Sequence, residues 1–130
     1  MLFSSIHHCA IICSDYHKSK HFYVDLLGFT IINETYREER KSYKLDLKIG
    51  NAFSGQIELF SFPDPPKRLT HPEACGLRHL AFDVTNVEKT TETLKRLGIE
   101  TEPVRKDSLT GKRFTFFRDP DDLPIEIYEK

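Results

Sequence analysis

The feature that most constrains this chain is an internal repeat. The pattern His-x-Ala occurs at His8 and again at His79, and a Leu-Gly pair closes each of the segments that follow, at Gly28 and Gly98. His8 precedes Gly28 by 20 residues, and His79 precedes Gly98 by 19. A repeat with a period of ~70 residues predicts two similar units that stack, because such units rarely bury their hydrophobic faces alone.

Each repeat ends in the same kind of strand, with one glutamate at its centre. Residues 56–60 read Gln-Ile-Glu-Leu-Phe, and residues 124–128 read Pro-Ile-Glu-Ile-Tyr. Because side chains alternate across a strand, Glu58 and Glu126 point away from their aliphatic neighbours. A carboxylate on such a strand is costly to bury unless it is paired, hydrogen-bonded or bound to a metal. Two carboxylates placed alike call for a common explanation.

The hydrophobic periodicity predicts the same order of elements in both halves. In the first half we expect strands at 6–13, 29–36, 43–49 and 56–62, with a turn between Gly50 and Gly55 and a helix capped by Asp15. In the second half we expect strands at 77–84, 99–104, 113–118 and 123–129, and a helix opened by a capping box of Thr85 and Glu88. The order β-α-β-β-β occurs twice. It predicts an α+β fold in which two βαβββ modules form a concave, barrel-like mixed sheet with the helices outside.

The domain organisation follows from length and from one proline-rich stretch. At 130 residues with 38% hydrophobic residues, the chain has enough apolar surface for one core. We expect a single domain over 1–130, with a first module at about 4–62, a linker at 63–76 and a second module at 77–130.

Charge and hydropathy exclude several classes of partner. The net charge of −1 gives no reason to expect nucleic acid or an anionic membrane. The apolar runs are far shorter than the ~20 residues of a membrane span, and the first residues do not resemble a signal peptide. Three cysteines without CxxC spacing do not form a disulfide framework. We therefore expect a cytoplasmic protein with a small-molecule substrate.

Four repeat-related residues predict a metal site. His8, Glu58, His79 and Glu126 are all expected on the concave face, and imidazole with carboxylate suits Zn, Ni, Fe, Co or Mn rather than Ca. The alternative is two unrelated core histidines and two salt-bridged glutamates. The recurrence of the same two residue types at matching positions favours one divalent transition metal.

The motifs that carry these residues resemble the vicinal oxygen chelate superfamily. The resemblance covers nearly the whole chain, through the segments at 8–11, 26–29, 57–60, 77–82 and 119–126. The superfamily includes glyoxalase I, extradiol dioxygenases, methylmalonyl-CoA epimerase and fosfomycin-resistance thiol transferases, and this chain is most similar to a small bacterial glyoxalase-like branch. The resemblance implies paired βαβββ modules around a metal, with His8, Glu58, His79 and Glu126 as its ligands. It also implies a homodimer, and some members build each site from two chains.

This ligand set favours proton-transfer chemistry. A metal can hold two oxygens of a substrate, polarise a carbonyl and stabilise the enediolate that forms. Glu126 or Glu58 would act as the general base, and the sequence does not distinguish them. The expected activity is that of a glyoxalase-like isomerase or lyase acting on a small α-oxo compound or its thiol adduct. The main alternative is a metal-dependent thiol or water transferase acting on an antibiotic or another electrophile, as a resistance protein does. A drug-binding module and a ring-cleaving dioxygenase are weaker alternatives.

The sequence says less about the substrate. Glyoxalase I typically carries an arginine shortly after its first histidine to hold glutathione, and residues 9–13 contain none. Arg113, Arg118 and Phe60 are the candidate substrate-binding residues. The alternatives are a solvated strand end for the arginines and a core position for Phe60.

Overall fold

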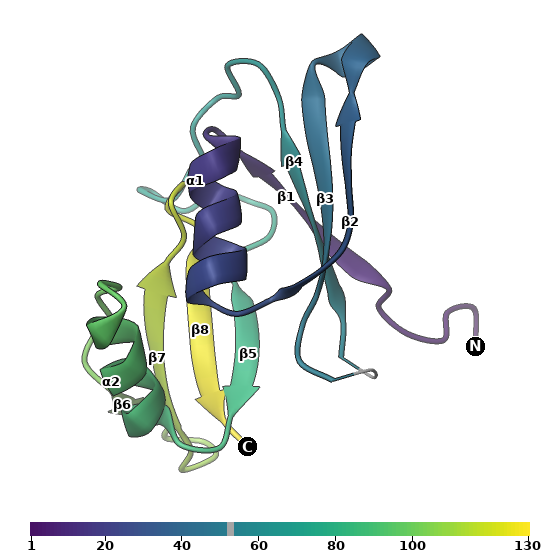
Figure 1. The fold of residues 1–130 in the computed structure, drawn as a ribbon. Coiled ribbons are helices and arrows are strands. Elements are labelled where there is room, and N and C mark those ends of the chain that lie inside the picture. Colours follow the sequence, from purple (N-terminus) through teal and green to yellow (C-terminus); the bar gives the residue numbers. More distant parts are fainter. Residues whose placement is uncertain (52–53) are drawn as a thin grey trace. The chain divides into compact units, whose positions relative to one another are not determined.

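The computed structural model describes residues 1–51 and 54–130, which form two compact units, Met1–Lys67 and Arg68–Lys130 (Figure 1). The boundary after Lys67 falls within the proline-rich stretch 63–76. The turn expected between Gly50 and Gly55 includes residues that lie outside the described ones. The assignment of the chain to a single domain remains a prediction.

The first unit contains one four-stranded mixed sheet. Its elements in chain order are β1 (His8–Cys13), α1 (Tyr16–Lys20), a π-helical turn η1 (His21–Leu26), β2 (Thr30–Arg37), a 3-10 turn η2 (Glu38–Arg40), β3 (Ser42–Lys48) and β4 (Gln56–Ser61). The strand order is β1-β4-β3-β2, in which β1 is parallel to β4 and the other pairs are antiparallel.

The second unit repeats this topology. Its elements are β5 (Leu80–Val84), α2 (Val87–Arg96), β6 (Arg105–Lys106), β7 (Arg113–Arg118) and β8 (Pro124–Glu129). The strand order is β5-β8-β7-β6, again with one parallel pair, β5 with β8. The predicted α+β fold of two βαβββ units is confirmed, and the strands form two open sheets of four.

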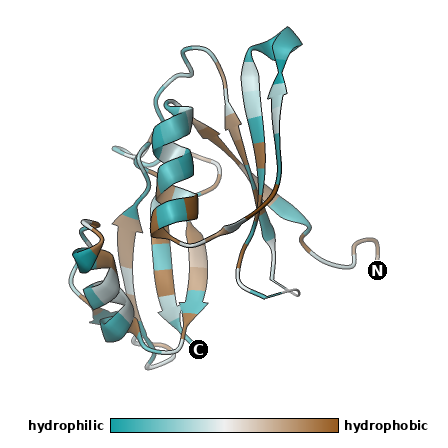
Figure 2. Cartoon of the chain, viewed as in Figure 1, coloured by the Kyte–Doolittle hydropathy of each residue, from teal (hydrophilic) through white to brown (hydrophobic). Residues whose placement is uncertain are grey.

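Alternation along the strands separates a buried face from a polar one. Figure 2 shows hydrophobic and hydrophilic bands alternating along the strands. Ile57 and Leu59 on β4 are buried, as are Ile125 and Ile127 on β8. The residues between them face the opposite way, so each central glutamate lies on the more open face of its sheet.

The first helix begins as expected and ends in an unexpected way. Asp15 accepts a hydrogen bond from the backbone N–H of Lys18 at 3.1 Å, which confirms it as the N-cap. The last turn is π-helical, with the N–H of Leu27 bonded to the carbonyl of Phe22. Gly28 then takes a φ of 77°, a left-handed conformation that glycine adopts without strain.

The N-cap of α2 is Asn86, so the predicted capping box of Thr85 and Glu88 is wrong by one residue. The Asn86 side chain accepts from the N–H of Lys89 at 2.9 Å, and its backbone is extended, as an N-cap requires. Both threonine and asparagine can cap, so the sequence left two adjacent choices.

The strand predicted at 99–104 is also wrong, because the ladder there is limited to Arg105–Lys106. Pro103 has no N–H to donate to a neighbouring strand. The buried hydroxyl of Thr115 instead donates to the carbonyl of Glu102 at 2.7 Å. A side chain thus satisfies a backbone group that strand pairing would otherwise satisfy.

Two further strands begin two or three residues later than predicted. β1 starts at His8, which pairs with the first residue of β4, so Ile6 and His7 have no partner strand. β5 starts at Leu80 rather than residue 77. The Arg68 side chain donates to the carbonyls of Leu77 and Arg78 at 2.5 and 3.0 Å, and so satisfies them without a sheet.

Candidate functional site: two histidine–glutamate pairs

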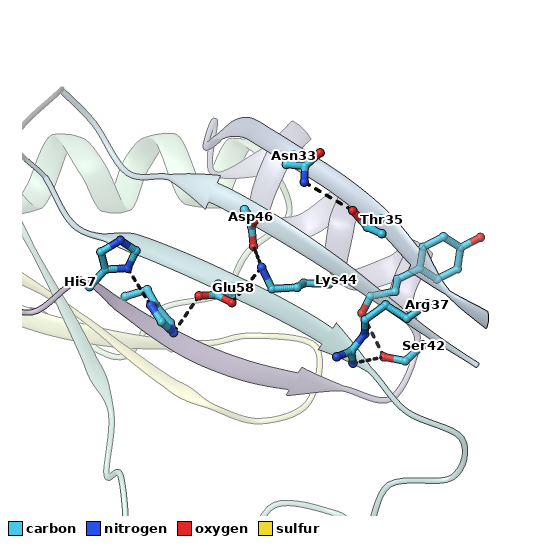
Figure 3. Close-up of polar contacts among 10 residues, drawn as sticks. His7, Asn33, Thr35, Arg37, Ser42, Lys44, Asp46 and Glu58 are labelled. Carbon is cyan, nitrogen blue, oxygen red and sulfur yellow. Dashed lines mark hydrogen bonds and ion pairs between the residues drawn. The ribbon is translucent and has the colours of Figure 1, made fainter. Parts of the chain in front are cut away.

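The first candidate pair lies on the open face of the first unit. β1 and β4 are parallel, with Ala10 opposite Glu58, and His8 lies two residues before Ala10 on the same face. The Nε2 atom of His8 is 2.7 Å from Oε2 of Glu58 (Figure 3). Strand register therefore brings together two residues that are 50 positions apart in the sequence.

Glu58 has two further charged neighbours on β3. Lys44 Nζ lies 3.1 Å from Glu58 Oε1 and 2.8 Å from Asp46 Oδ1 (Figure 3). The pKa of Lys44 is raised above its ordinary value, chiefly because Asp46 accepts a hydrogen bond from the ammonium and secondly because Glu58 does. Both carboxylate oxygens of Glu58 are therefore engaged, one by His8 and one by Lys44.

His7 contacts His8, although successive side chains along a strand point to opposite faces. The Nδ1 atoms of the two rings are 2.9 Å apart, and the rings meet edge to face. His7 precedes β1, so the alternation of a strand does not extend to it.

The second candidate pair lies in the second unit. His79 immediately precedes β5, and its Nε2 is 3.0 Å from Oε2 of Glu126 on β8. The imidazole also stands edge-on to the ring of Phe116, with centroids 5.1 Å apart. No hydrogen bond or ion pair to Glu126 Oε1 occurs within 1–51 and 54–130.

Register shows that the two pairs are equivalent. Ala81 pairs with Glu126 exactly as Ala10 pairs with Glu58, and each histidine lies two residues before its alanine. The repeat seen in the sequence is thus a repeat of spatial pairing within each sheet.

The antiparallel neighbours of the two glutamates differ. Asp46 on β3 lies opposite Glu58, whereas Phe116 on β7 lies opposite Glu126. The first glutamate therefore has a charged environment and the second an aromatic one.

A cavity of about 470 Å³ lies beside the second pair, and the described residues that line it belong to the second unit. His79 and Glu126 contribute to it, together with the aromatic rings of Phe114 and Phe116. Its volume lies within the range of ligand pockets, roughly 300–1,000 Å³. Three arginines also line it: Arg78, Arg105 and Arg118.

The predicted substrate-binding residues have different surroundings. Arg118 lines the cavity. Arg113 forms an ion pair with Glu88 and is not among the described residues that line the cavity. In the first unit, Phe60 stacks with Phe62 and lies beneath the guanidinium of Arg37, 4.9 Å from the ring centroid.

The donor spacing in each pair is that of an ordinary hydrogen-bonded pair, and two ligands of one cation lie about as far apart. Two donors ~2.1 Å from one cation and at right angles to each other lie about 3.0 Å apart. The distances of 2.7 Å for His8–Glu58 and 3.0 Å for His79–Glu126 are close to this value. Within the described residues, no group of three or more His, Cys, Asp or Glu is placed to hold a metal. Each unit supplies two of the four predicted ligands, and a site shared by both pairs remains a prediction.

Sequence reasoning missed Lys44, Asp46 and Arg105 as neighbours of the candidate site. Lys44 and Asp46 alternate with buried leucines on β3, which indicated their face but not their partner strand. Arg105 lies in a two-residue strand that periodicity cannot detect.

Comparisons with known proteins agree with this fold. Residues 5–127 match the Glyoxalase/Bleomycin resistance protein/Dioxygenase superfamily. The chain is 66% identical to "Uncharacterized protein YwkD" of Bacillus subtilis (strain 168) over the full length of both, and 53% identical to "Uncharacterized protein YaeR" of Escherichia coli (strain K12), covering 96% and 95% of the two chains. The crystal structure of the glyoxalase family protein from Enterococcus faecalis is 50% identical and superposes with a TM-score of 0.91, covering 99% of this chain and 100% of that one.

No helix in the described part of the chain is long and apolar enough to cross a membrane. The sequence match covers both repeats, and its range includes both histidine–glutamate pairs. The chain belongs to the Glyoxalase/Bleomycin resistance protein/Dioxygenase superfamily.

Proposed function

We propose that this protein is a metal-dependent isomerase or lyase of the glyoxalase type, acting on a small α-oxo compound or its thiol adduct. The observation that carries the proposal is the repeated histidine–glutamate pair, held at equivalent register positions with donor distances of 2.7 and 3.0 Å. His8, Glu58, His79 and Glu126 would hold one divalent ion of Ni, Zn, Co, Mn or Fe. Such an ion supplies a Lewis acid that polarises a carbonyl and stabilises negative charge on its oxygen.

The chain itself supplies the base, and we assign this role to Glu126. Oε2 of Glu126 faces His79, while Oε1 has no hydrogen bond or ion pair among the described residues. Glu58, by contrast, is held at both oxygens, by His8 and Lys44. A carboxylate with one unengaged oxygen can take the proton from the hydroxyl-bearing carbon beside the carbonyl and return it to the carbonyl carbon, while the hydroxyl proton passes to the former carbonyl oxygen. The substrate is then isomerised without net oxidation.

Neighbouring rings orient the two imidazoles. His7 lies against Nδ1 of His8, which leaves Nε2 directed toward Glu58. Phe116 stands edge-on to His79. Contacts of this kind fix the orientation of a ring, and a fixed ring presents the same nitrogen to a ligand each time.

A metal titration tests the ligand set. Protein stripped of metal and titrated calorimetrically with each of the five ions should bind one ion per chain. His8→Ala or His79→Ala should each weaken binding by about a hundredfold or more, because each removes a ligand. His21→Ala is the matched control, since His21 forms an exposed pair with Asp25 at the same 2.7 Å. Two ions per chain, or equal loss in the control, would refute a single shared site.

Turnover tests the assignment of the base. With methylglyoxal and a panel of thiols as substrates, Glu126→Gln should lower kcat by roughly 10²–10⁴-fold, the usual contribution of a general base. In D₂O, the same variant should lose exchange of the substrate proton, followed by NMR. Glu58→Gln should act mainly through weaker metal binding, and excess metal should restore part of its activity. If Glu126→Gln kept full exchange and Glu58→Gln lost it, the base would be Glu58.

The proposal includes a homodimer located in the cytoplasm. Light scattering coupled to size-exclusion chromatography measures the mass in solution, and cell fractionation measures the location. A chain that is a monomer at all concentrations would contradict the first part.

A further inference from the structure

The cavity of the second unit contains two arginines without close protein partners. Of its three arginines, Arg78 is engaged: its Nε lies 2.7 Å from Glu73, and this pair holds the pKa of Glu73 below its usual value. Among the described residues, Arg105 and Arg118 form longer ion pairs, at 3.7 Å from Glu102 and 3.8 Å from Asp122. Both distances exceed the range of a hydrogen bond.

Arg105 is oriented by aromatic rings. Its guanidinium carbon lies 5.1 Å from the centroid of Phe114 and 5.7 Å from that of Phe116. Phe114 is also the residue opposite Arg105 in the β6–β7 ladder. Strand pairing and the ring contact therefore both keep Arg105 beside Phe114. A guanidinium stacked on rings keeps its N–H groups at the edge of its plane, where they can bind an oxyanion in a bidentate manner.

The hairpin that carries Arg105 is held from the adjacent strand. The Tyr128 hydroxyl donates to Asp107 Oδ2 at 2.9 Å and lies 2.5 Å from the hydroxyl of Thr110. Tyr128 belongs to β8, two residues beyond Glu126 on the same face. The position of Arg105 is therefore coupled to the strand that carries the proposed base.

Arg118 has an unsatisfied donor. Its Nη1 atom is buried and has no hydrogen-bond partner among the described residues. A buried N–H group without a partner is rare in proteins and costs free energy, so such a group indicates that a partner is missing. The Arg118 side chain as a whole is 38% exposed and lines the cavity.

We propose that Arg105 and Arg118 form an oxyanion-binding subsite, and that the substrate carries a carboxylate or a phosphate in addition to its oxo group. The identification of this ligand as the substrate rests on the proposed function, whereas the binding of the anion does not. The cavity also contains Glu73, Glu102 and Glu126, and of these Glu73 is neutralised by Arg78. An anionic ligand would offer Arg105 and Arg118 shorter contacts than the 3.7 and 3.8 Å ion pairs that they form with Glu102 and Asp122.

Matched ligand pairs test the proposal in metal-free protein. Pyruvate is compared with its methyl ester, and dihydroxyacetone phosphate with dihydroxyacetone, by calorimetry at low ionic strength. The anion of at least one pair should bind about tenfold or more tightly than its neutral partner, because charge-assisted bonds are lost with the charge. The pair with the larger ratio identifies carboxylate or phosphate. Equal affinity within both pairs would overturn the proposal.

Variants locate the subsite. Arg105→Gln and Arg118→Gln should each reduce the preference for the anion by about tenfold, and Arg118→Lys should retain part of it, because lysine keeps the charge without the bidentate geometry. Arg96→Gln, on the exposed surface of α2, is the matched control and should change nothing. Circular dichroism establishes that each variant is folded. An anion preference lost in Arg113→Gln but kept in Arg105→Gln and Arg118→Gln would place the anion elsewhere and refute the proposal.

The two proposals fail separately. If the metal titration fails while the anion preference persists, the oxyanion subsite stands and the glyoxalase-type reaction does not. If the metal binds to the histidine–glutamate pairs but charged and neutral ligands bind alike, the subsite is refuted and the reaction stands.

Discussion

At the scale of single residues, one carboxylate joins the first helix to the neighbouring edge strand. Glu34 on β2 accepts hydrogen bonds at the same oxygen from Tyr16 and from Lys20, the latter at 2.7 Å. Its pKa is lowered, first by Lys20 and then by Tyr16. The pKa of Tyr16 is raised well above its usual range, first by burial and then by Glu34. The tyrosine ring also stacks on Tyr43 of β3, with centroids 4.0 Å apart.

Glu34→Gln should lower stability at neutral pH and leave it nearly unchanged in acid. Because the native pKa of Glu34 is below its unfolded value of ~4.3, its contribution is complete above that value and disappears as the pH falls through the native pKa. We expect the free energy of unfolding to fall by about 0.5–1 kcal/mol at pH 7. The value is small because the side chains of Lys20 and Glu34 are each about one-third exposed. Urea unfolding at several pH values measures it, with Glu39→Gln on the exposed η2 turn as control. A difference that grew in acid would contradict the sign.

At the scale of elements, the N-cap of α2 can be tested directly, because the sequence predicted Thr85 there and the structure has Asn86. Asn86 makes the capping hydrogen bond and Thr85 does not. Asn86→Ala should therefore lower the free energy of unfolding by about 1 kcal/mol, and Thr85→Ala should have little effect. Thermal or urea unfolding of the two variants measures the difference. Equal losses would show that the threonine contributes to the cap after all.

The elements also show which interactions a sequence reveals. Alternation is local, so the buried faces of β4 and β8 could be predicted from Ile57, Leu59 and their counterparts. Strand ends were less predictable, because they depend on where a partner strand begins and on distant side chains. The Thr115 hydroxyl donates a hydrogen bond to a carbonyl in the predicted strand 99–104. The Arg68 guanidinium does the same for the carbonyl of Leu77, before β5.

The candidate site was predictable to the same extent. The repeat identified His8 and Glu58 because both recur, and the structure brings them within 2.7 Å. Lys44 and Arg105 have no counterpart in the other half, so the repeat could not reveal them. Their contacts depend on cross-strand register and on a two-residue strand, neither of which is encoded within a few neighbouring positions.

At the scale of the whole molecule, the proposed site would need residues from both units. Saturating metal at a hundred times its dissociation constant should stabilise the wild type by about 2.7 kcal/mol, or roughly 10 °C in Tm. Adding a chelator should reverse the shift. His8→Ala alone and His79→Ala alone should each reduce the stabilisation to about 0.4 kcal/mol or less at the same metal concentration, because a hundredfold weaker site is then only half occupied, although each variant leaves one pair intact. Thermal unfolding measures this, and a half-sized shift in each variant would show two independent sites.

The different neighbours of the twin glutamates limit how far the two halves can replace each other. Asp46 stands opposite one glutamate and Phe116 opposite the other, and the described residues that line the 470 Å³ cavity belong to the second half. A chimaera with two first halves would keep both imidazole–carboxylate pairs but would place an aspartate, in place of Phe116, opposite both glutamates. One with two second halves would lack the lysine that anchors a carboxylate. The two halves therefore share one topology and one histidine–glutamate register, but neither half can replace the other without changing the surroundings of a glutamate.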